Sequence, residues 1–240
     1  MLKTLNKYFE AYKKHKKESE RNLKELIWAN VYHDSIRGKI WLENQALNVG
    51  RWAGNYAFFY LMNRILSDAK PKSILEFGLG ESTKFISCFL KNELKKTKHL
   101  VIEDDENWIK LFNSNFKVNS QTKIKHIASE NVVVNGFSTK SYKDLLSYVE
   151  ADYDLYVIDG PHGSPNYSRY NIVEIVKKFE ANKEFIIVLD DYNRSGEKET
   201  VKEIITNLAS QGIQYEITVL KGVVDVALIV SKKYSFLKTV

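Results

Sequence analysis

The chain has 240 residues, of which 44% are hydrophobic and 28% are charged, and its formal net charge is +6. A chain of this length can bury a substantial core without disulfide bonds or a structural metal. Its single cysteine, Cys88, excludes a disulfide framework and a cysteine-based zinc cluster. The pattern that Cys88 shares with Phe85 and Phe89 predicts a small core residue in a reduced protein.

We expect neither a membrane span nor a signal peptide from this sequence. No stretch reaches the roughly 18 apolar residues that a span needs, and charges interrupt the N-terminal segment. We therefore expect a cytoplasmic protein without membrane contact. The positive charge lies largely in two lysine runs, at 13–17 and 91–98, which lack interleaved aromatic residues. Such runs are typical of solvated helix faces, which disfavours a nucleic-acid partner.

The first 70 residues show helical periodicity. Apolar residues repeat at helical spacing over Leu2–Tyr12 and again over Leu23–Val31, with a charged stretch between the two segments. A third helix is predicted from about Asn55 to Ser67, and Pro71 ends it. We assign residues 1–50 to a helical extension that forms a lid, and residues 51–240 to the main domain.

From Ser73 onwards, short β-runs alternate with helices. The predicted strands are Ser73–Phe77, His99–Glu103, Lys123–Ala128, Leu155–Asp159, Phe185–Asp190, Tyr215–Leu220 and Asp225–Val230. The predicted helices are Thr83–Leu94, Asn107–Asn115, Ser141–Tyr148, Tyr170–Phe179 and Lys198–Gln211. This alternation predicts an α/β fold, in which a parallel sheet has helices on both faces. Residues 221–224 are too short for a parallel crossover, so the last two strands form an antiparallel hairpin. Residues 131–140 receive no assignment.

The first predicted strand ends in the sequence Glu76-Phe77-Gly78-Leu79-Gly80. In an open α/β sheet, ligands bind beyond the carboxyl ends of the strands. Gly78 and Gly80 lack Cβ atoms, so a ligand can approach the main chain there. Ser82 and Thr83 are candidate caps of the next helix, whose free N–H groups face the same crevice.

The second strand ends in Glu103, whose carboxylate can accept hydrogen bonds from both hydroxyls of a ribose. Asp104 and Asp105 follow it, so the assignment can shift by a residue. A dinucleotide site prefers a third glycine where this chain has Thr83. The acids Glu76 and Glu81 disfavour a diphosphate and favour a cationic amino-acid cofactor. The preferred ligand is therefore S-adenosylmethionine (SAM).

These features together resemble the class I SAM-dependent methyltransferases over roughly residues 50–235. The resemblance rests on Glu-x-Gly-x-Gly after strand one, an acid after strand two and a closing antiparallel hairpin. It implies a Rossmann-like sheet of seven strands in the order 3-2-1-4-5-7-6, with the last strand antiparallel. It also implies that Glu76, Gly78, Gly80 and Glu103 line the cofactor. The loop after strand three, which includes Ser129, would contact the adenine.

Strands four and five end in acids. Asp159 is followed three residues later by His162, and Asp190 and Asp191 end the next strand. The two strands should be neighbours, and converging carboxylates raise one another's pKa unless a cation lies between them. We therefore predict that Asp159, Asp190 and Asp191 hold Mg²⁺, which activates a substrate hydroxyl. His162 is the candidate general base, with Asp159 as its catalytic partner.

This arrangement resembles the metal-dependent O-methyltransferases, both the catechol type and the type that acts on macrolide sugars. The latter show Asp-x-x-His after strand four and an acidic pair after strand five. The Gly160-Pro161 pair departs from that pattern and also resembles polysaccharide-directed methyltransferases, which leaves the acceptor open. The acids could instead cap turns, Asp191 could pair locally with Arg194, and His162 could be a turn residue.

Two further segments are candidates for substrate contacts. Tyr167, Arg169 and Tyr170 could line a sugar-binding rim or simply pack in the core, and Arg51 with Trp52 could close over the cofactor. The predicted function is SAM-dependent O-methylation of a sugar, glycan or small polyol, assisted by Mg²⁺. The alternatives are an RNA methyltransferase and a non-catalytic SAM-binding protein of a glycan pathway. A homo-oligomer is compatible with the sequence.

Overall fold

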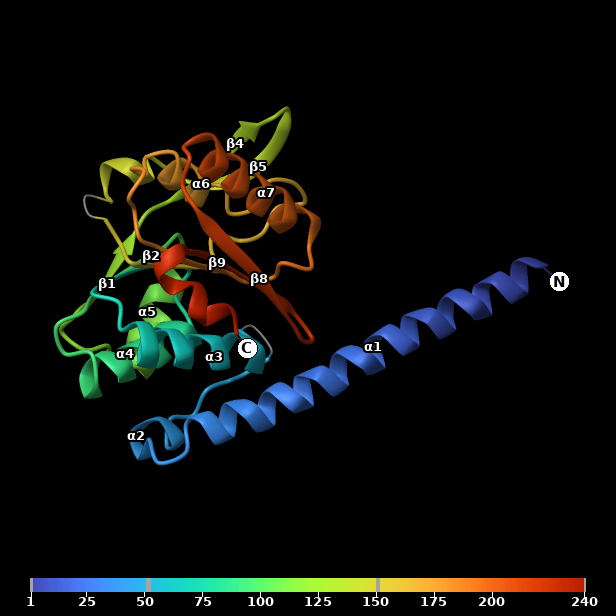
Figure 1. Cartoon of the computed structure of the whole chain (residues 1–240), viewed down its shortest axis with the longest axis horizontal. Coiled ribbons are helices and arrows are strands. Elements are labelled where there is room, and N and C mark those ends of the chain that lie inside the picture. Colours follow the sequence, from blue (N-terminus) through green and yellow to red (C-terminus); the bar gives the residue numbers. More distant parts are fainter. Residues whose placement is uncertain (1, 51–52, 150–151, 240) are drawn as a thin grey trace.

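The computed structural model describes residues 2–50, 53–149 and 152–239 (Figure 1). Its helices and helical turns are α1 (Leu2–Ser35), α2 (Ile40–Glu43), α3 (Tyr56–Arg64), η1 (Ile65–Ala69), α4 (Glu81–Asn92), α5 (Glu106–Asn115), η2 (Leu145–Ser147), α6 (Asn171–Val176), α7 (Ser195–Ser210) and η3 (Lys232–Lys238). Its strands are β1 (Ser73–Phe77), β2 (Lys98–Glu103), β3 (Thr122–His126), β4 (Ser129–Val134), β5 (Phe137–Tyr142), β6 (Leu155–Ile158), β7 (Ile186–Leu189), β8 (Tyr215–Lys221) and β9 (Asp225–Ser231).

Seven strands form one sheet in the order β3-β2-β1-β6-β7-β9-β8. In this sheet β3, β2, β1, β6 and β7 pair in parallel, and β9 runs antiparallel to both of its neighbours, β7 and β8. This confirms the predicted fold class and strand order, including the antiparallel last strand. Because β1, β2, β6 and β7 are parallel, their carboxyl ends meet at one edge, and that edge carries the residues singled out from the sequence.

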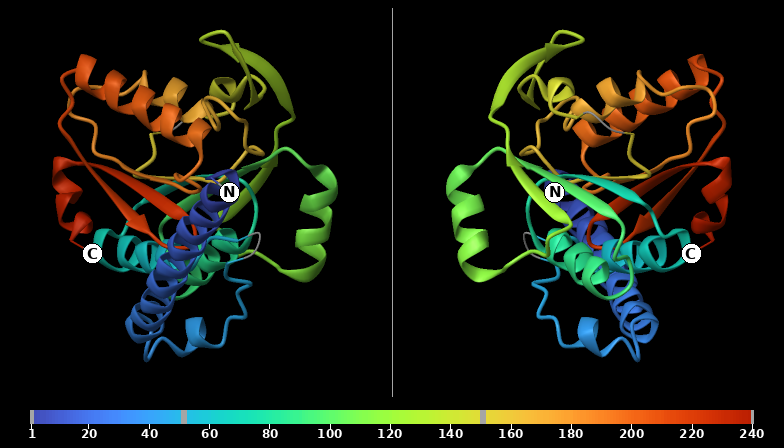
Figure 2. Two further views of the ribbon diagram at one scale, coloured as in Figure 1. Left: turned by 90° about the vertical axis from the view of Figure 1, so that its right-hand side faces the viewer. Right: turned by 90° about the vertical axis from the view of Figure 1, so that its left-hand side faces the viewer.

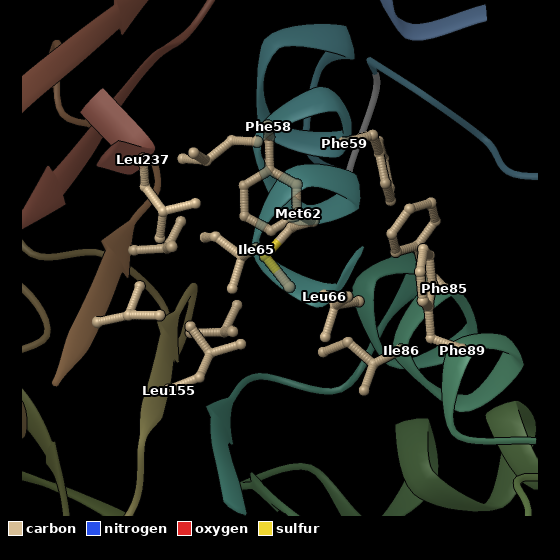
Figure 3. Packing of buried hydrophobic residues seen from close by; sticks show 14 of the residues in the cluster. Phe58, Phe59, Met62, Ile65, Leu66, Phe85, Ile86, Phe89, Leu155 and Leu237 are labelled. Atoms are coloured by element: carbon tan, nitrogen blue, oxygen red, sulfur yellow. The ribbon is translucent and has the colours of Figure 1, made fainter. Parts of the chain in front are cut away.

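Helices cover both faces of the sheet (Figure 2). The strands β6 and β7 are buried along their whole length, as expected for central strands covered on both sides. One apolar cluster joins α3, α4 and η3 to the sheet, and a second joins α6 and α7 to the opposite face. Figure 3 shows Phe58 and Ile65 on the side of α3 that faces Leu237 of η3, and Phe59 on the side that faces Phe85 and Phe89 of α4.

The N-terminal region is one continuous helix of 34 residues, whereas two helices separated by a charged stretch were expected. Lysine and glutamate are good helix formers, and no glycine or proline interrupts the stretch. The C-terminal half of α1 packs on the body, where Trp28 Nε1 donates to the carbonyl of Lys221 (3.0 Å). The N-terminal half extends beyond the body (Figure 1). Within the described residues, no helix is long and apolar enough to cross a membrane.

The segment from Ser129 to Tyr142 is a β-hairpin made of β4 and β5. It includes residues 131–140, which the sequence had left unassigned. The helix predicted over Ser141–Tyr148 is wrong, because Ser141 and Tyr142 end β5 and only a short 3₁₀ turn follows. Asp144 has a φ of +48°, which breaks any helix at that point.

Candidate functional site

A cavity of about 1160 Å³ opens at the carboxyl edge of the sheet, where ligands bind in folds of this kind. Its lining residues come from the loops after β1, β2 and β6, from the segment between α2 and α3, and from α3, α4, α5 and β5. The lining residues are Leu47–Val49, Ala53, Gly54, Tyr56, Gly78–Ser82, Glu103–Asp105, Trp108, Lys140, Tyr142 and Asp159–His162. Six of the predicted site residues therefore line the cavity: Gly78, Gly80, Ser82, Glu103, Asp159 and His162.

The two glycines after β1 have different roles. Gly78 has a φ of +93°, and a Cβ on it would lie 3.1 Å from the backbone nitrogen of Gly160. Gly78 thus lets the loop after β1 pack directly on the loop after β6. A Cβ on Gly80 would meet nothing within 4 Å. Gly80 therefore leaves open space at the wall of the cavity, which a ligand can enter.

The first turn of α4 is fixed by Thr83. Its Oγ1 accepts a hydrogen bond from Gly80 N (3.1 Å) and donates one to Glu76 Oε2 (2.9 Å). Glu76 is fully buried, and its Oε2 also lies 2.9 Å from His99 Nε2. Glu76 lies outside the cavity lining and anchors the loop from within the core. The structure therefore gives no support to the predicted contact between Glu76 and the cofactor.

The carboxylate of Glu103 holds the loops after β1 and β2 together at the cavity wall. Oε2 accepts from Leu79 N (2.9 Å), and Oε1 accepts from the backbone nitrogens of Asp104 (2.9 Å) and Asp105 (3.0 Å). Burial raises the pKa of Glu103, although these N–H groups oppose the shift. Each carboxylate oxygen has two lone pairs, so Oε2 can still accept a bond from a ligand hydroxyl.

Ser129 contacts Asp104, which lines the cavity. Its hydroxyl donates to Asp104 Oδ2, and Lys140 Nζ lies 3.2 Å from the same oxygen. Burial acts to raise the pKa of Asp104, but these two partners lower it overall. Ser129 itself lies outside the lining. Lys140 could not be placed from the sequence, because its hairpin had no assignment.

Trp108 is a wall residue that sequence reasoning missed. It lies in the first turn of α5, where its Nε1 donates to the carbonyl of Leu79 (2.6 Å), and 42% of the residue is exposed. Asp105 caps the same helix by accepting from Trp108 N (3.1 Å). An aromatic residue five positions after Glu103, at a helix start, was the signal available in the sequence.

Arg169 is the centre of the acidic cluster. It is 3% exposed, and its Nη2 lies 2.9 Å from Asp159 Oδ1 and 2.8 Å from Asp191 Oδ2. Its Nη1 donates to the carbonyl oxygen of Asp190 (2.9 Å). Arg169 and Asp191 both have a φ of +60°, which residues with a Cβ rarely adopt. One guanidinium thus joins the loops after β6 and β7.

The three acids do not form the magnesium site predicted from the sequence. Arg169 supplies the positive charge between Asp159 and Asp191, and Asp191 also pairs with Arg194 (2.8 Å). Asp190 is 5% exposed, its Oδ1 accepts from Asp191 N (2.9 Å), and burial raises its pKa. No set of three His, Cys, Asp or Glu side chains in the described part of the chain is placed to hold a metal ion. The donor set does not fit Mg²⁺, because a guanidinium already occupies the position between the carboxylates.

Asp159 and His162 lie on the wall of the cavity, on either side of a cis Gly160–Pro161 bond. His162 is exposed, and burial raises the pKa of Asp159 while Arg169 opposes the shift. Tyr167 and Tyr170 lie outside the lining and pack against each other. The predicted closure by Arg51 and Trp52 concerns residues outside those that the structure describes.

No protein-family model matches the sequence, and the search of curated proteins gave no match. The structure is similar to that of an O-methyltransferase from Bacillus cereus in complex with SAH, with a TM-score of 0.55 and 12% sequence identity over 90% of this chain and 100% of that chain. It is also similar to the SAH-bound Podospora anserina methyltransferase PaMTH1, with a TM-score of 0.50 and 15% identity over 75% and 80% of the two chains. The chain therefore has the fold of the class I SAM-dependent methyltransferases.

Proposed function

We propose that the protein is a SAM-dependent O-methyltransferase that acts on a hydroxyl group of a sugar, glycan or small polyol. The observation that carries the proposal is the single cavity wall shared by Gly80, Glu103, Asp159 and His162. Glu103, a candidate to accept hydrogen bonds from a ribose, and His162, a candidate general base, thus lie at the same edge of a methyltransferase fold. The volume of about 1160 Å³ exceeds the usual range of ligand sites and leaves room for a cofactor and an acceptor together.

The residues after β1 and β2 fit SAM. Glu103 would accept hydrogen bonds from the ribose hydroxyls, and the open space at Gly80 would admit the ligand next to the main chain. The ring of Trp108 offers a flat apolar face for the adenine. Glu81 and Asp104 also lie on the wall, where each pairs with a lysine, Lys84 (2.6 Å) and Lys140 (3.2 Å). When bound, SAM supplies an electrophilic methyl group.

The residues after β6 fit proton transfer from the acceptor. His162 would take the proton of the acceptor hydroxyl as the oxygen–methyl bond forms and the sulfur–methyl bond breaks. Asp159 is held by Arg169, so it offers a fixed hydrogen-bond acceptor that orients the hydroxyl. Other polar groups of the lining, such as Asn48 and Lys140, support an acceptor with several hydroxyl groups.

The direct test is transfer of labelled methyl from SAM across a panel of sugars, nucleotide sugars, polyols and RNAs. We expect transfer to an acceptor of the first three kinds. Labelling of RNA alone, with steeply salt-dependent binding, would support the RNA methyltransferase instead. SAM binding without transfer to any member would support the non-catalytic protein.

Methyl transfer should be independent of added metal, because Arg169 already neutralises Asp159 and Asp191. We expect the same rate in EDTA and in Mg²⁺. We also expect neither Mg²⁺ nor Mn²⁺ to raise the melting temperature, whereas a bound ion would stabilise the folded state. Metal-dependent activity that Asp159→Asn abolishes would show that the ion displaces the arginine.

Replacing Glu103 should weaken SAM binding. We expect Glu103→Ala to raise the Kd for SAM about 10- to 100-fold, since hydrogen bonds to a charged group contribute about 1.5–3 kcal/mol. Isothermal titration calorimetry measures the effect, with the exposed Glu106→Ala as the control. Glu103→Gln retains one oxygen acceptor and should show a smaller loss. An unchanged Kd in both Glu103 variants would refute the ribose assignment.

A further inference from the structure

The two halves of α1 carry opposite charge. Residues 2–17 contain six lysines and one glutamate, which gives a net charge of +5. Residues 18–35 contain one arginine and one lysine against three glutamates and one aspartate, which gives −2. The helix is therefore basic towards its free end and acidic where it joins the body.

Each half carries a group of exposed apolar residues, and the two groups form a stripe that His15, Lys16 and Ser19 interrupt. Its members and their exposed fractions are Tyr8 (74%), Phe9 (58%), Tyr12 (66%), Leu23 (61%), Leu26 (64%) and Ile27 (54%). Tyr8 and Leu26 are 18 residues apart, as are Phe9 and Ile27. This spacing equals about five helical turns, so both groups lie on the same face.

Most of the stripe lies on the side of α1 opposite to the body, and Ile27 at its edge lines a pocket with Trp28 and β8. The body side carries Arg21, which pairs with Asp225 (3.1 Å), together with Trp28 and the buried Tyr32. These residues repeat at intervals of seven and four, which places them on one face. Leu26 and Trp28 are two positions apart, and residues at that spacing do not share a face. The core that holds α1 in place thus leaves the stripe uncovered.

An uncovered stripe of this size indicates an interaction surface. Large apolar patches on soluble proteins mark contact sites. Helices gain most of their stability from packing of an apolar face, and segments of about 12–15 residues are marginal alone. The N-terminal half of α1 extends away from the body (Figure 1), so its apolar side chains gain nothing from the fold itself.

We propose that α1 pairs with α1 of a second copy of this chain in an antiparallel helix pair. The two-fold axis would pass between Lys17 and Glu18. Tyr8 and Ile27 are equally distant from that point, as are Phe9 and Leu26, and Tyr12 and Leu23. An antiparallel partner therefore covers each aromatic side chain with an aliphatic one. It also places the basic half of each helix beside the acidic half of the other.

Charge favours a second copy over an anionic membrane surface. A basic amphipathic helix can lie on such a surface, but half of this stripe belongs to the acidic segment 18–35, which anionic lipids would repel. The self-complementary pattern is what a two-fold interface requires, because the same patch serves both subunits. The dimer is independent of the proposed enzymatic activity.

Sedimentation equilibrium of the full chain tests the pairing. We expect a dimer for the wild type and at least tenfold weaker association for Leu23→Lys with Leu26→Lys, which places cations beside the partner's basic half. The matched control is Val133→Lys, which replaces an apolar residue that is 76% exposed on the β4–β5 hairpin. Circular dichroism checks that all three proteins fold alike. A monomeric wild type, or a double variant that dimerises like the control, would overturn the proposal.

Cysteine cross-linking in a Cys88→Ser background tests the direction of the helices. In the antiparallel pair, the two copies of Ser19 lie three residues apart along the axis, about 4.5 Å, and the two copies of Tyr8 about 28 Å apart. We expect Ser19→Cys to form an intermolecular disulfide and Tyr8→Cys to remain reduced. Cross-linking through Tyr8→Cys would indicate parallel helices and contradict the proposal. So would a monomer that binds vesicles of anionic lipid.

Discussion

Arg169→Ala should destabilise the fold by about 3–5 kcal/mol, the cost of leaving buried charges without their partner. The guanidinium is 3% exposed and neutralises Asp159 and Asp191, which come from the loops after β6 and β7. Without it, these two carboxylates and that of the fully buried Glu197, which lies 3.9 Å from Arg169 Nε, are left with Arg194 as the neighbouring cation. Urea denaturation at pH 8 measures the loss. Arg169→Lys keeps the charge but not the two-branched geometry, so its loss should be smaller.

The matched control is Arg194→Ala. Arg194 contacts Asp191 at the same distance, 2.8 Å, but its side chain is 53% exposed. An ion pair of that kind contributes less than about 1 kcal/mol. If Arg194→Ala lowered the free energy of unfolding as much as Arg169→Ala, Arg169 would not be the main residue that neutralises Asp159 and Asp191.

The loss of stability caused by Arg169→Ala should depend on pH. Burial raises the pKa of Asp159, and Arg169 opposes the shift, so its removal raises that pKa further. The folded variant then binds more protons than the unfolded chain, whose aspartates titrate near pH 3.9. Its stability therefore rises as pH falls through the raised pKa. We expect a smaller gap between Arg169→Ala and the wild type at pH 5 than at pH 8.

The sheet was predictable because its strands and helices have distinct local patterns. Strands such as β6 and β7 are short apolar runs between turn residues, and the three residues between β8 and β9 allow only a hairpin. The position of the cavity could be predicted in the same way, because the acids and glycines that follow parallel strands meet at the carboxyl edge of the sheet. Glu103, Asp159 and His162 were all placed on the cavity wall by that topology.

What could not be predicted depends on contacts between segments far apart in the chain. The acids after β6 and β7 looked unpaired, because nothing local shows that Arg169 would turn inward between them. The sequence predicted that Glu76 lines the cofactor, but it did not show that His99 and Thr83 would contact the Glu76 carboxylate. In the β4–β5 hairpin the apolar Val133 and Phe137 are exposed while the polar Thr139 and Ser141 are buried, so its sequence lacks the usual alternation of a strand.

His162→Gln should lower kcat about 10²- to 10⁴-fold for the acceptor found in the labelling panel, the range expected when a general acid or base is removed. The side chain lies on the cavity wall three residues after Asp159, and glutamine can still donate and accept hydrogen bonds but cannot take the proton at neutral pH. The Kd for SAM should stay within about twofold, because the proposed cofactor contacts come from the loops after β1 and β2. Steady-state kinetics and calorimetry measure the two quantities separately.

The control is His15→Gln on the free half of α1, where the side chain is 85% exposed. It should leave both kcat and the Kd for SAM unchanged. Since His162 is exposed, its replacement should also leave the melting temperature unchanged, which separates loss of the base from loss of the fold. A kcat equal to that of the His15 variant would mean that the proton leaves by another route. Asp159, fixed by Arg169 on the same wall, would then be the next group to test.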